Sequence, residues 1–171
     1  TIAGPEGELA LSVPTVKPEN PKCPMKDIRI SDHGNWRHLH WNAMESAYNS
    51  TPFFEYYKDD FCPFYEKKYE FLTDFNEELC RLVCKLIDIQ PDTERTTEYK
   101  ADFAPNEIDF REAIHPNKNF RQADPEFIPQ PYYQVFETRH GFLPNLSIID
   151  LLFNMGPESL LILQQTIANP R

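Results

Sequence analysis

Residues 31–57 read SDHGNWRHLHWNAMESAYNSTPFFEYY, and this stretch decides the fold. It holds both tryptophans, three of the five histidines and three of the eight tyrosines of the chain. No other window is as dense in side chains that can both pack in a core and take part in chemistry. The pattern predicts a turn, a helix and then a second, aromatic helix, and it is the first place to look for a site.

The first helix of this stretch is predicted over Trp36–Tyr48. Trp36, His40 and Met44 recur at helical spacing and share one face, which places His40 inward. His38 and His40 lie two residues apart, about 200° around a helix, so the pair cannot ligate one metal ion. We predict no metal and no cofactor. His40 is open to two interpretations, a hydrogen-bonded wall residue or a catalytic base.

The whole chain, residues 1–171, is predicted to form a single domain of mixed α/β fold, with a small sheet packed by several helices. Alternation and β-branched or aromatic residues predict strands at Leu9–Val13, Lys26–Ile30 and Tyr132–Phe136. Apolar periodicity predicts helices at 36–48, 53–71, 74–88 and 146–168, the second interrupted near Pro63 and the last divided at Gly156–Pro157. Sixteen prolines and only five glycines favour Pro-rich, ordered connections.

Asp150 is the most informative residue outside the opening stretch. It lies in a helical pattern, at 146–153, with apolar residues on both sides. A buried carboxylate must be paired, hydrogen-bonded or protonated, because burying an isolated charge is costly. Two interpretations follow: a perturbed carboxylate facing a cleft, or a structural ion pair with Arg29, Arg37 or Arg111.

Charge and composition exclude several classes of partner. The net charge of −10 disfavours nucleic-acid binding, which needs clustered positive charge, and disfavours an anionic membrane surface for the same reason. No apolar run approaches the roughly 20 residues of a membrane helix. No secretory signal is visible and the four cysteines are interpreted as reduced thiols, so we predict a cytoplasmic location.

Two long stretches resemble a known family. The first runs from LSVPTV through MKDIRIS and GNWRHLHWNAMESAYNSTPFFEYY to FYEKKYEFLTDFNEELCRLV, and the second is YYQVFETRHGFLPNLSIIDLLFNMGPES. Together they resemble the WbqC-like family, in the version with the longer GFLPNLSIIDLLFN segment. Members usually begin with a further strand and an aromatic, proline-containing segment, which are absent before Thr1. We therefore expect this chain to miss its N-terminal strand region.

The resemblance implies a bacterial family associated with O-antigen and surface-polysaccharide gene clusters, and a transferase that attaches an amino acid or a similar group to a sugar or nucleotide-sugar. The candidate catalytic residues are Asp150, His40 and His33. The candidate substrate-binding residues are Trp36, Arg37, Tyr48, Asn145 and Ser147. No GxSxG, GxGxxG, P-loop or HExxH motif fixes a reaction, so a non-catalytic scaffold of the same pathway and a metal-dependent hydrolase stay open as alternatives.

Overall fold

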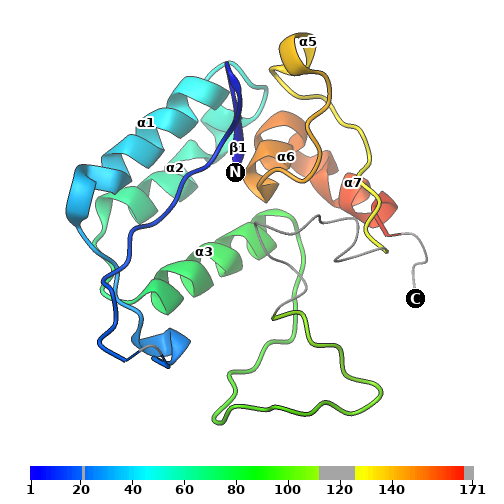
Figure 1. Cartoon of the computed structure of the whole chain (residues 1–171). Helices are drawn as coiled ribbons and strands as arrows, with labels where there is room; N and C mark the ends of the chain where they lie inside the picture. The colour runs from blue at the N-terminus through cyan, green and yellow to red at the C-terminus, as the bar shows by residue number, and fades with distance from the viewer. Residues whose placement is uncertain (21, 112–125, 168–171) are drawn as a thin grey trace.

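The three longest helices form one side of the molecule and two shorter ones form the other. This computed structural model describes residues 1–20, 22–111 and 126–167. Figure 1 shows α1 (Trp36–Tyr48), α2 (Phe54–Glu66) and α3 (Leu72–Leu86) on one side, with α6 (Ile148–Met155) and α7 (Ser159–Gln165) on the other. The N-terminal strand β1 (Ile2–Gly4) runs between the two groups and contacts both α1 and α6. The fold is mixed α/β and mostly helical, as predicted.

Helix α1 is confirmed with the predicted bounds. Its buried residues are Trp36, His40, Met44, Ala47 and Tyr48. The first four positions follow the spacing that the sequence indicated, and Tyr48 adds a second buried aromatic at the end of the helix. Because α1 rises about 1.5 Å per residue, Tyr48 stands about 12 Å along the axis from His40. The two ends of α1 therefore serve different parts of the core.

Helix α2 differs from the prediction because Pro63 does not interrupt it. The helix runs from Phe54 to Glu66 with Pro63 inside its last turn. At that place the proline removes one intrahelical hydrogen bond only three residues before the end, so little helix is lost. Phe54, Tyr57 and Phe61 are buried at helical spacing, and this packing outweighs the missing bond. Lys67 is extended, so the helix does not resume towards Phe71.

The sheet is smaller than predicted and differently placed. It consists of β1 and β2 (Gly7–Leu9), an antiparallel hairpin in which Ile2 pairs with Leu9. The predicted strand at Leu9–Val13 contributes only Leu9. In place of the strand at Lys26–Ile30 there is a 3-10 turn, Met25–Asp27, followed by isolated bridges from Arg29 to Phe71 and from Ile30 to Thr15. Each of these segments pairs with another part of the chain through one isolated bridge, and they do not form a continuous ladder of strand hydrogen bonds.

The predicted strand at Tyr132–Phe136 is also wrong. The segment is irregular and leads into a short helix, α5 (Glu137–His140). The backbone N–H of Val135 donates to the side-chain Oδ1 of Asn154 at 3.2 Å, so a side chain takes the place of a neighbouring strand. This substitution could not be read from local alternation, because Asn154 is almost twenty residues further along the chain.

The C-terminal helices are divided where the sequence predicted. α6 begins at Ile148, after Ser147, and not at Asn145, whose left-handed backbone (φ 60°) turns the chain before the helix. Gly156 (φ 54°) ends α6, and a 3-10 turn, Gly156–Glu158, leads into α7. A Cβ at Gly156 would come within 2.5 Å of the Phe53 ring, so this glycine is required for close packing as well as for its dihedral angle.

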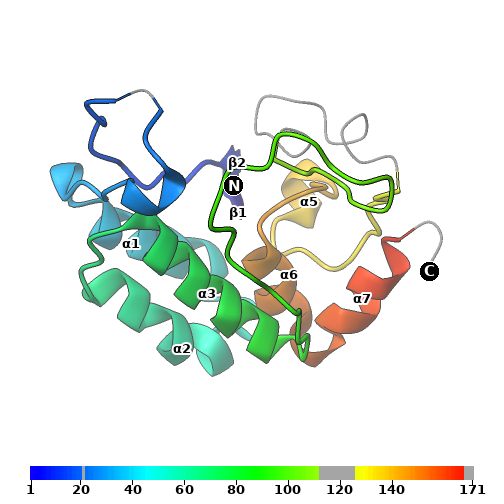
Figure 2. The same cartoon turned by 90° about the horizontal axis from the view of Figure 1, so that it is seen from below.

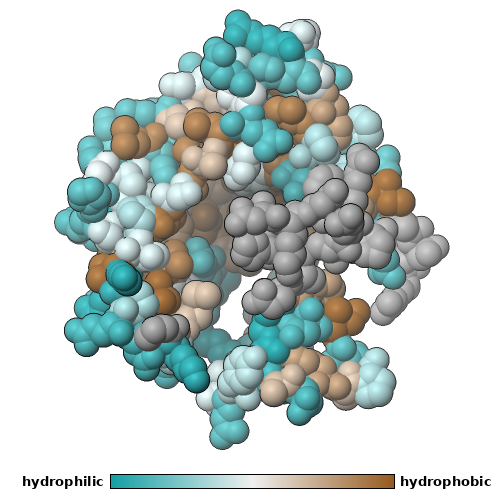
Figure 3. All heavy atoms as spheres, viewed as in Figure 1, coloured by the Kyte–Doolittle hydropathy of each residue, from teal (hydrophilic) through white to brown (hydrophobic). Residues whose placement is uncertain are grey.

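The core is aromatic and has two centres. The Phe153 ring of α6 meets the rings of Tyr48, Phe54 and Phe61 edge-on, at centroid distances of 5.1–5.4 Å. A second cluster surrounds Trp36 at the other end of α1 and includes Ile30, Tyr69 and Phe75. Figure 2 shows α1, α2 and α3 packed as one group beside α6 and α7. On the face drawn in Figure 3, the described hydrophobic residues lie in separate patches among hydrophilic ones.

Candidate functional site

Asp150 lies at the centre of a buried hydrogen-bond network. The residue is fully buried, and its carboxylate accepts three hydrogen bonds. Tyr48 of α1 donates to Oδ1 at 2.8 Å. Tyr132 donates to Oδ2 at 2.8 Å, and the amide of Gln134 donates to the same oxygen at 3.1 Å. Two phenols and an amide, all neutral, thus surround a carboxylate that contacts no positive charge among the described residues.

The environment of Asp150 favours its protonated form more than water does. Burial raises the pKa of the Asp150 carboxyl, and the hydrogen bonds from Tyr132, Tyr48 and Gln134 oppose this rise only in part. The pKa of Tyr48 and that of Tyr132 are both raised, first by burial and then by the neighbouring Asp150 charge. Both phenols therefore stay neutral and donate their protons to the carboxylate.

The network is fixed from several elements. The Tyr48 oxygen also accepts the backbone N–H of Ala3 in β1, at 3.2 Å. Gln134 is held by Leu143 in both directions, its Nε2 donating to the Leu143 oxygen and its Oε1 accepting the Leu143 N–H, each at 2.9 Å. Asn154, one turn after Asp150, donates to the Asp150 carbonyl at 2.7 Å. These bonds make one rigid unit of β1, α1, α6 and the 132–143 segment.

The predicted ion pair between Asp150 and an arginine is not formed by any of the three candidates. Arg29 pairs with Glu70 at 2.6 Å and Arg37 pairs with Asp32 at 2.6 Å. Arg111 pairs with Asp109 at 2.7 Å. All three arginines bond carboxylates that are close in the chain or on the surface, whereas Asp150 is enclosed by the core where long cationic side chains would have to be desolvated.

A pocket of about 130 Å³ adjoins this network between α6, α7 and the 127–132 segment. Tyr132 lines it, and the Phe142 ring stands edge-on to Tyr132 at a centroid distance of 5.4 Å. Asn145 and Ser147, both predicted from sequence to bind substrate, line the same pocket. Among the described residues neither side chain makes a hydrogen bond, so their polar groups are available to a ligand. Asp150 itself reaches the pocket only through Tyr132.

The other predicted site residues lie in the second aromatic cluster. The His40 ring stands edge-on to Trp36 at 5.1 Å and to Tyr65 at 6.3 Å. Trp36 is buried and donates its indole N–H to the Ser31 oxygen at 3.0 Å. Burial lowers the pKa of His40, although a hydrogen bond with the Ser12 backbone partly opposes this, so His40 is held neutral. Neither residue lines the pocket beside Asp150.

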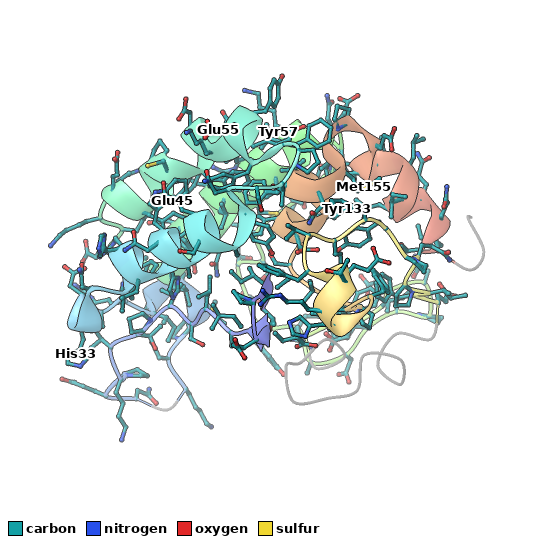
Figure 4. All side chains as sticks on the ribbon, turned by 90° about the horizontal axis from the view of Figure 1, so that it is seen from above. His33, Glu45, Glu55, Tyr57, Tyr133 and Met155 are labelled. Carbon is teal, nitrogen blue, oxygen red and sulfur yellow. The ribbon has the colours of Figure 1, made fainter. Side chains whose placement is uncertain are left out.

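Arg37 and His33 lie at the start of α1, far from that pocket. The Arg37 guanidinium stacks over the Trp36 ring at 4.7 Å, and its Nε and Nη2 are buried without a hydrogen-bond partner among the described residues. His33 is exposed in a 3-10 turn, His33–Asn35. Figure 4 shows His33 at the opposite end of the molecule from Tyr133, the neighbour of Tyr132 in the chain. The structure therefore brings together Tyr48, Asn145, Ser147 and Asp150, and separates Trp36, Arg37, His40 and His33 from them.

The described histidines do not meet carboxylates or thiols in a metal-binding arrangement. Within 1–20, 22–111 and 126–167, no group of three or more His, Cys, Asp or Glu side chains is close enough to hold an ion. His38 contacts Asn42, and the His140 ring contacts the Pro5 oxygen at 2.9 Å. The fifth histidine, His115, lies outside the described residues.

A larger groove, of about 250 Å³, lies along α3 and is lined by charged residues. Its cations are all paired with carboxylates. Arg95 makes two bonds to Glu77, at 2.7 and 2.6 Å, and Lys67 bonds Glu78 at 3.2 Å. Such exposed, mutually neutralised charges leave no excess charge for a ligand to recognise. The smaller pocket beside Asp150, with its unpaired polar groups and apolar walls, has the character of a ligand site.

Two residues that complete the network, Tyr132 and Gln134, were not predicted from the sequence. Both fell in the segment interpreted as a strand, in which alternate side chains should face solvent. Gln134 between two apolar neighbours was the available signal, because a glutamine inside a hydrophobic run needs a buried polar partner. That signal gives no indication of which residue the partner is.

One family model, that of the WbqC-like protein family, matches residues 1–122 and 106–162. The chain belongs to the WbqC-like protein family. The match includes every residue of the Asp150 network, from Ala3 in β1 to Asp150 in α6. No curated protein and no solved structure matches this WbqC-like chain. Among the described residues, no helix combines the length and the apolar character that crossing a bilayer requires.

Proposed function

We propose that this WbqC-like protein is a transferase of bacterial surface-polysaccharide assembly, which moves an aminoacyl or similar acyl group onto a hydroxyl of a sugar or nucleotide-sugar. The observation that carries the proposal is the buried Asp150 carboxylate hydrogen-bonded to Tyr132, which lines a pocket. Membership of the family supports the pathway, through the association with O-antigen gene clusters that the resemblance implies.

Tyr132 and Asp150 form a proton relay in this proposal. The Tyr132 proton is directed to Oδ2 of Asp150, and the Tyr132 oxygen, which also interacts with the Gln134 side chain, would accept the proton of a substrate hydroxyl with its remaining lone pair. The raised pKa of Asp150 makes its carboxylate a better proton acceptor than a solvated one. Because Tyr132 gives one proton as it receives another, it remains neutral throughout. Asp150 acts through Tyr132 and is a positioning and proton-storing residue.

The substrate oxygen forms a bond to the acyl carbon, and the bond from that carbon to its leaving group breaks. The hydroxyl proton passes to Tyr132, and the proton of Tyr132 passes to Asp150. The departing group then takes the proton back by the reverse path. Asn145 and Ser147, whose side chains are unpaired at the pocket, would orient the carbonyl oxygen or a neighbouring hydroxyl.

The test compares Tyr132→Phe with Tyr133→Phe. Tyr133 is exposed and adjacent in the chain, so its variant controls for the loss of a phenol in this segment. The protein is incubated with nucleotide-sugars and with aminoacyl or short-chain alkanoyl thioesters, and acylated sugar is measured by mass spectrometry. We expect Tyr132→Phe to lower the rate about 100-fold or more and Tyr133→Phe to leave it unchanged.

Two results would overturn the proposal. Equal rates in both variants would remove Tyr132 from the chemistry. Absence of product from every donor, together with no change in melting temperature in the presence of any nucleotide-sugar, would favour the non-catalytic scaffold, because a ligand that binds the native state raises its midpoint.

His40, His33, Trp36 and Arg37 stay predictions of the sequence. In the proposed reaction they have no part, because the relay and the pocket lie beyond the opposite end of α1. A second substrate site at the Trp36 cluster would bring them into function, and the Trp36 variant described in the Discussion tests for one.

A further inference from the structure

The size of the pocket beside Tyr132 limits what can enter it. Its volume of about 130 Å³ is slightly smaller than that of an apolar cavity of about 150 Å³, which holds one benzene molecule. A hexose with its hydroxyl groups exceeds this volume. A short aliphatic acyl group, of about four or five non-hydrogen atoms, fits it. If a sugar substrate binds here, only one substituent of it can be inside.

The walls of the pocket select an apolar group. Most of the lining residues are apolar, and five of them are aliphatic side chains from the two helices and the turn before them: Leu146, Ile148, Leu151, Ile162 and Leu163. Among such walls the hydroxyls of a sugar ring would lose their hydrogen bonds to water without replacement, which is costly. An alkyl chain loses no hydrogen bond there and gains from leaving water.

The polar groups lie at the mouth of the pocket. Asn145 is exposed, and Gln130 and Ser147 are half-buried, whereas Leu151 at the inner end is buried. Each of the three polar side chains is without a hydrogen bond among the described residues. A carbonyl group between an alkyl chain and a sugar would therefore meet hydrogen-bond donors, the Asn145 amide and the Ser147 hydroxyl, as the chain enters.

We propose that the pocket binds the short acyl group of the substrate, with the carbonyl at Asn145 and Ser147 and the sugar outside the mouth. This inference rests on the proposed function for the identity of the sugar, and it adds the chemical class and the length of the group that the pocket takes. The same site thereby selects acyl groups by length: a chain longer than the pocket is excluded by Leu151 and Ile162.

The test is a series of N-acyl hexosamines with acyl chains from acetyl to octanoyl, with unacylated hexosamine as the reference. Dissociation constants are measured on the full chain by NMR chemical-shift titration, which suits weak binding. We expect roughly fourfold tighter binding for each added methylene, until the chain reaches about four or five non-hydrogen atoms, and weaker binding beyond. Affinity that is independent of chain length, or that rises without limit up to octanoyl, would overturn the inference.

Three substitutions on α7 locate the effect. Ile162→Trp fills the pocket and should abolish the dependence on chain length, whereas Leu161→Trp, at an exposed position of the same helix, should retain it. Ile162→Val enlarges the pocket with little risk to folding and should move the best chain length up by about one methylene. Unchanged titrations in both Ile162 variants would place the acyl group elsewhere.

The outcomes separate this inference from the proposed transferase. A length optimum that responds to Ile162, in a protein without transfer activity, would retain the acyl pocket and remove the reaction. Transfer that depends on Tyr132 but is insensitive to acyl length and to Ile162 would retain the reaction and remove the acyl pocket.

Discussion

The two ends of α1 both bury an ionisable group that the sequence marked as catalytic, and they treat it in opposite ways. At the first end His40 is 8% exposed and packs among aromatic rings, and burial lowers its pKa and keeps it neutral. At the second end Tyr48 and its partners give three hydrogen bonds to Asp150, which is 0% exposed and borders a pocket through Tyr132. Burial alone therefore does not make a site: what differs is whether polar partners connect the buried group to a place where a ligand can bind.

The opposite pKa shifts have opposite consequences for stability. A histidine whose pKa is lowered in the fold binds fewer protons than in the unfolded chain, so acid destabilises the fold through it. A carboxyl whose pKa is raised binds more protons in the fold, so acid stabilises the fold through it as the pH falls towards the ordinary value of 3.8. The fold therefore loses stability in acid through the buried, neutral His40. At higher pH it loses stability through the buried, ionised carboxylate of Asp150.

The largest expected effect tests the aromatic end. Trp36→Ala removes a ring that contacts His40 and Phe75 and an indole bond to Ser31, and should lower the free energy of unfolding by about 3–5 kcal/mol. Denaturant titration measures it, with Leu39→Ala, an exposed position of the same helix, as the control. A stable Trp36→Ala protein that has lost only ligand binding would make this end a site and erase the contrast.

Tyr48→Phe probes the network end by removing one oxygen. The Asp150 Oδ1 and the Ala3 N–H would each lose their partner while buried, so we expect a loss of about 2–3 kcal/mol. Tyr56→Phe, on the exposed side of α2, should change the unfolding midpoint by less than the error of the measurement. If the two variants are equally stable, the phenol of Tyr48 does not hold the carboxylate.

Asp150→Asn asks whether the network requires a carboxylate. Asparagine keeps the shape and removes the buried charge, but its amide nitrogen faces the donating Nε2 of Gln134. The relief of burying a charge offsets part of the mismatch, so we expect a loss of about 1–2 kcal/mol. Asp59→Asn, on the surface, is the control for charge. A loss above about 4 kcal/mol would indicate a buried positive partner and return Asp150 to the ion-pair interpretation.

The smallest effect is the acid dependence of His40. The unfolded chain takes up a proton as the pH falls through 6.5, the ordinary value, whereas the folded chain does so only at lower pH. Its contribution to stability is therefore fully present above pH 6.5 and decreases below it, by less than about 1 kcal/mol at first. His40→Gln should remove this part of the pH dependence of unfolding. An unchanged pH profile in the variant would mean that the pKa of His40 is the same in the folded and the unfolded chain, as for an exposed histidine.

How far the sequence predicted the molecule depended on how local the cause was. The helical spacing of Trp36, His40 and Met44 is a property of neighbouring turns, and α1 was predicted to the residue. The strand at Tyr132–Phe136 failed because the backbone of Val135 bonds a side chain on α6, which no local pattern encodes. The predicted interruption of α2 at Pro63 was wrong, because the free-energy cost of a proline in a helix depends on how close it lies to the end of the helix.

In the candidate site, too, the sequence predicted the residues that are close together in the chain and not their distant partners. Asp150, Asn145 and Ser147 share one segment, and their proximity follows from the sequence of a single helix start. Tyr48 was predicted to bind substrate, and the structure places it as a buried donor to Asp150. Tyr132 and Gln134 were missed, because the sequence shows a buried carboxylate but not the partners that the fold supplies.

The sequence by itself determined the helices, the aromatic character of the core, the burial of Asp150 and the family. These depend on composition and on periodicities within a few turns. Only the tertiary structure decided that two tyrosines and a glutamine, and no arginine, hold that carboxylate, that the opening stretch divides between two clusters, and that the pocket lies beside its distant end. Those choices depend on contacts between residues up to 102 positions apart, whose free energy is set by shape and desolvation in the folded core.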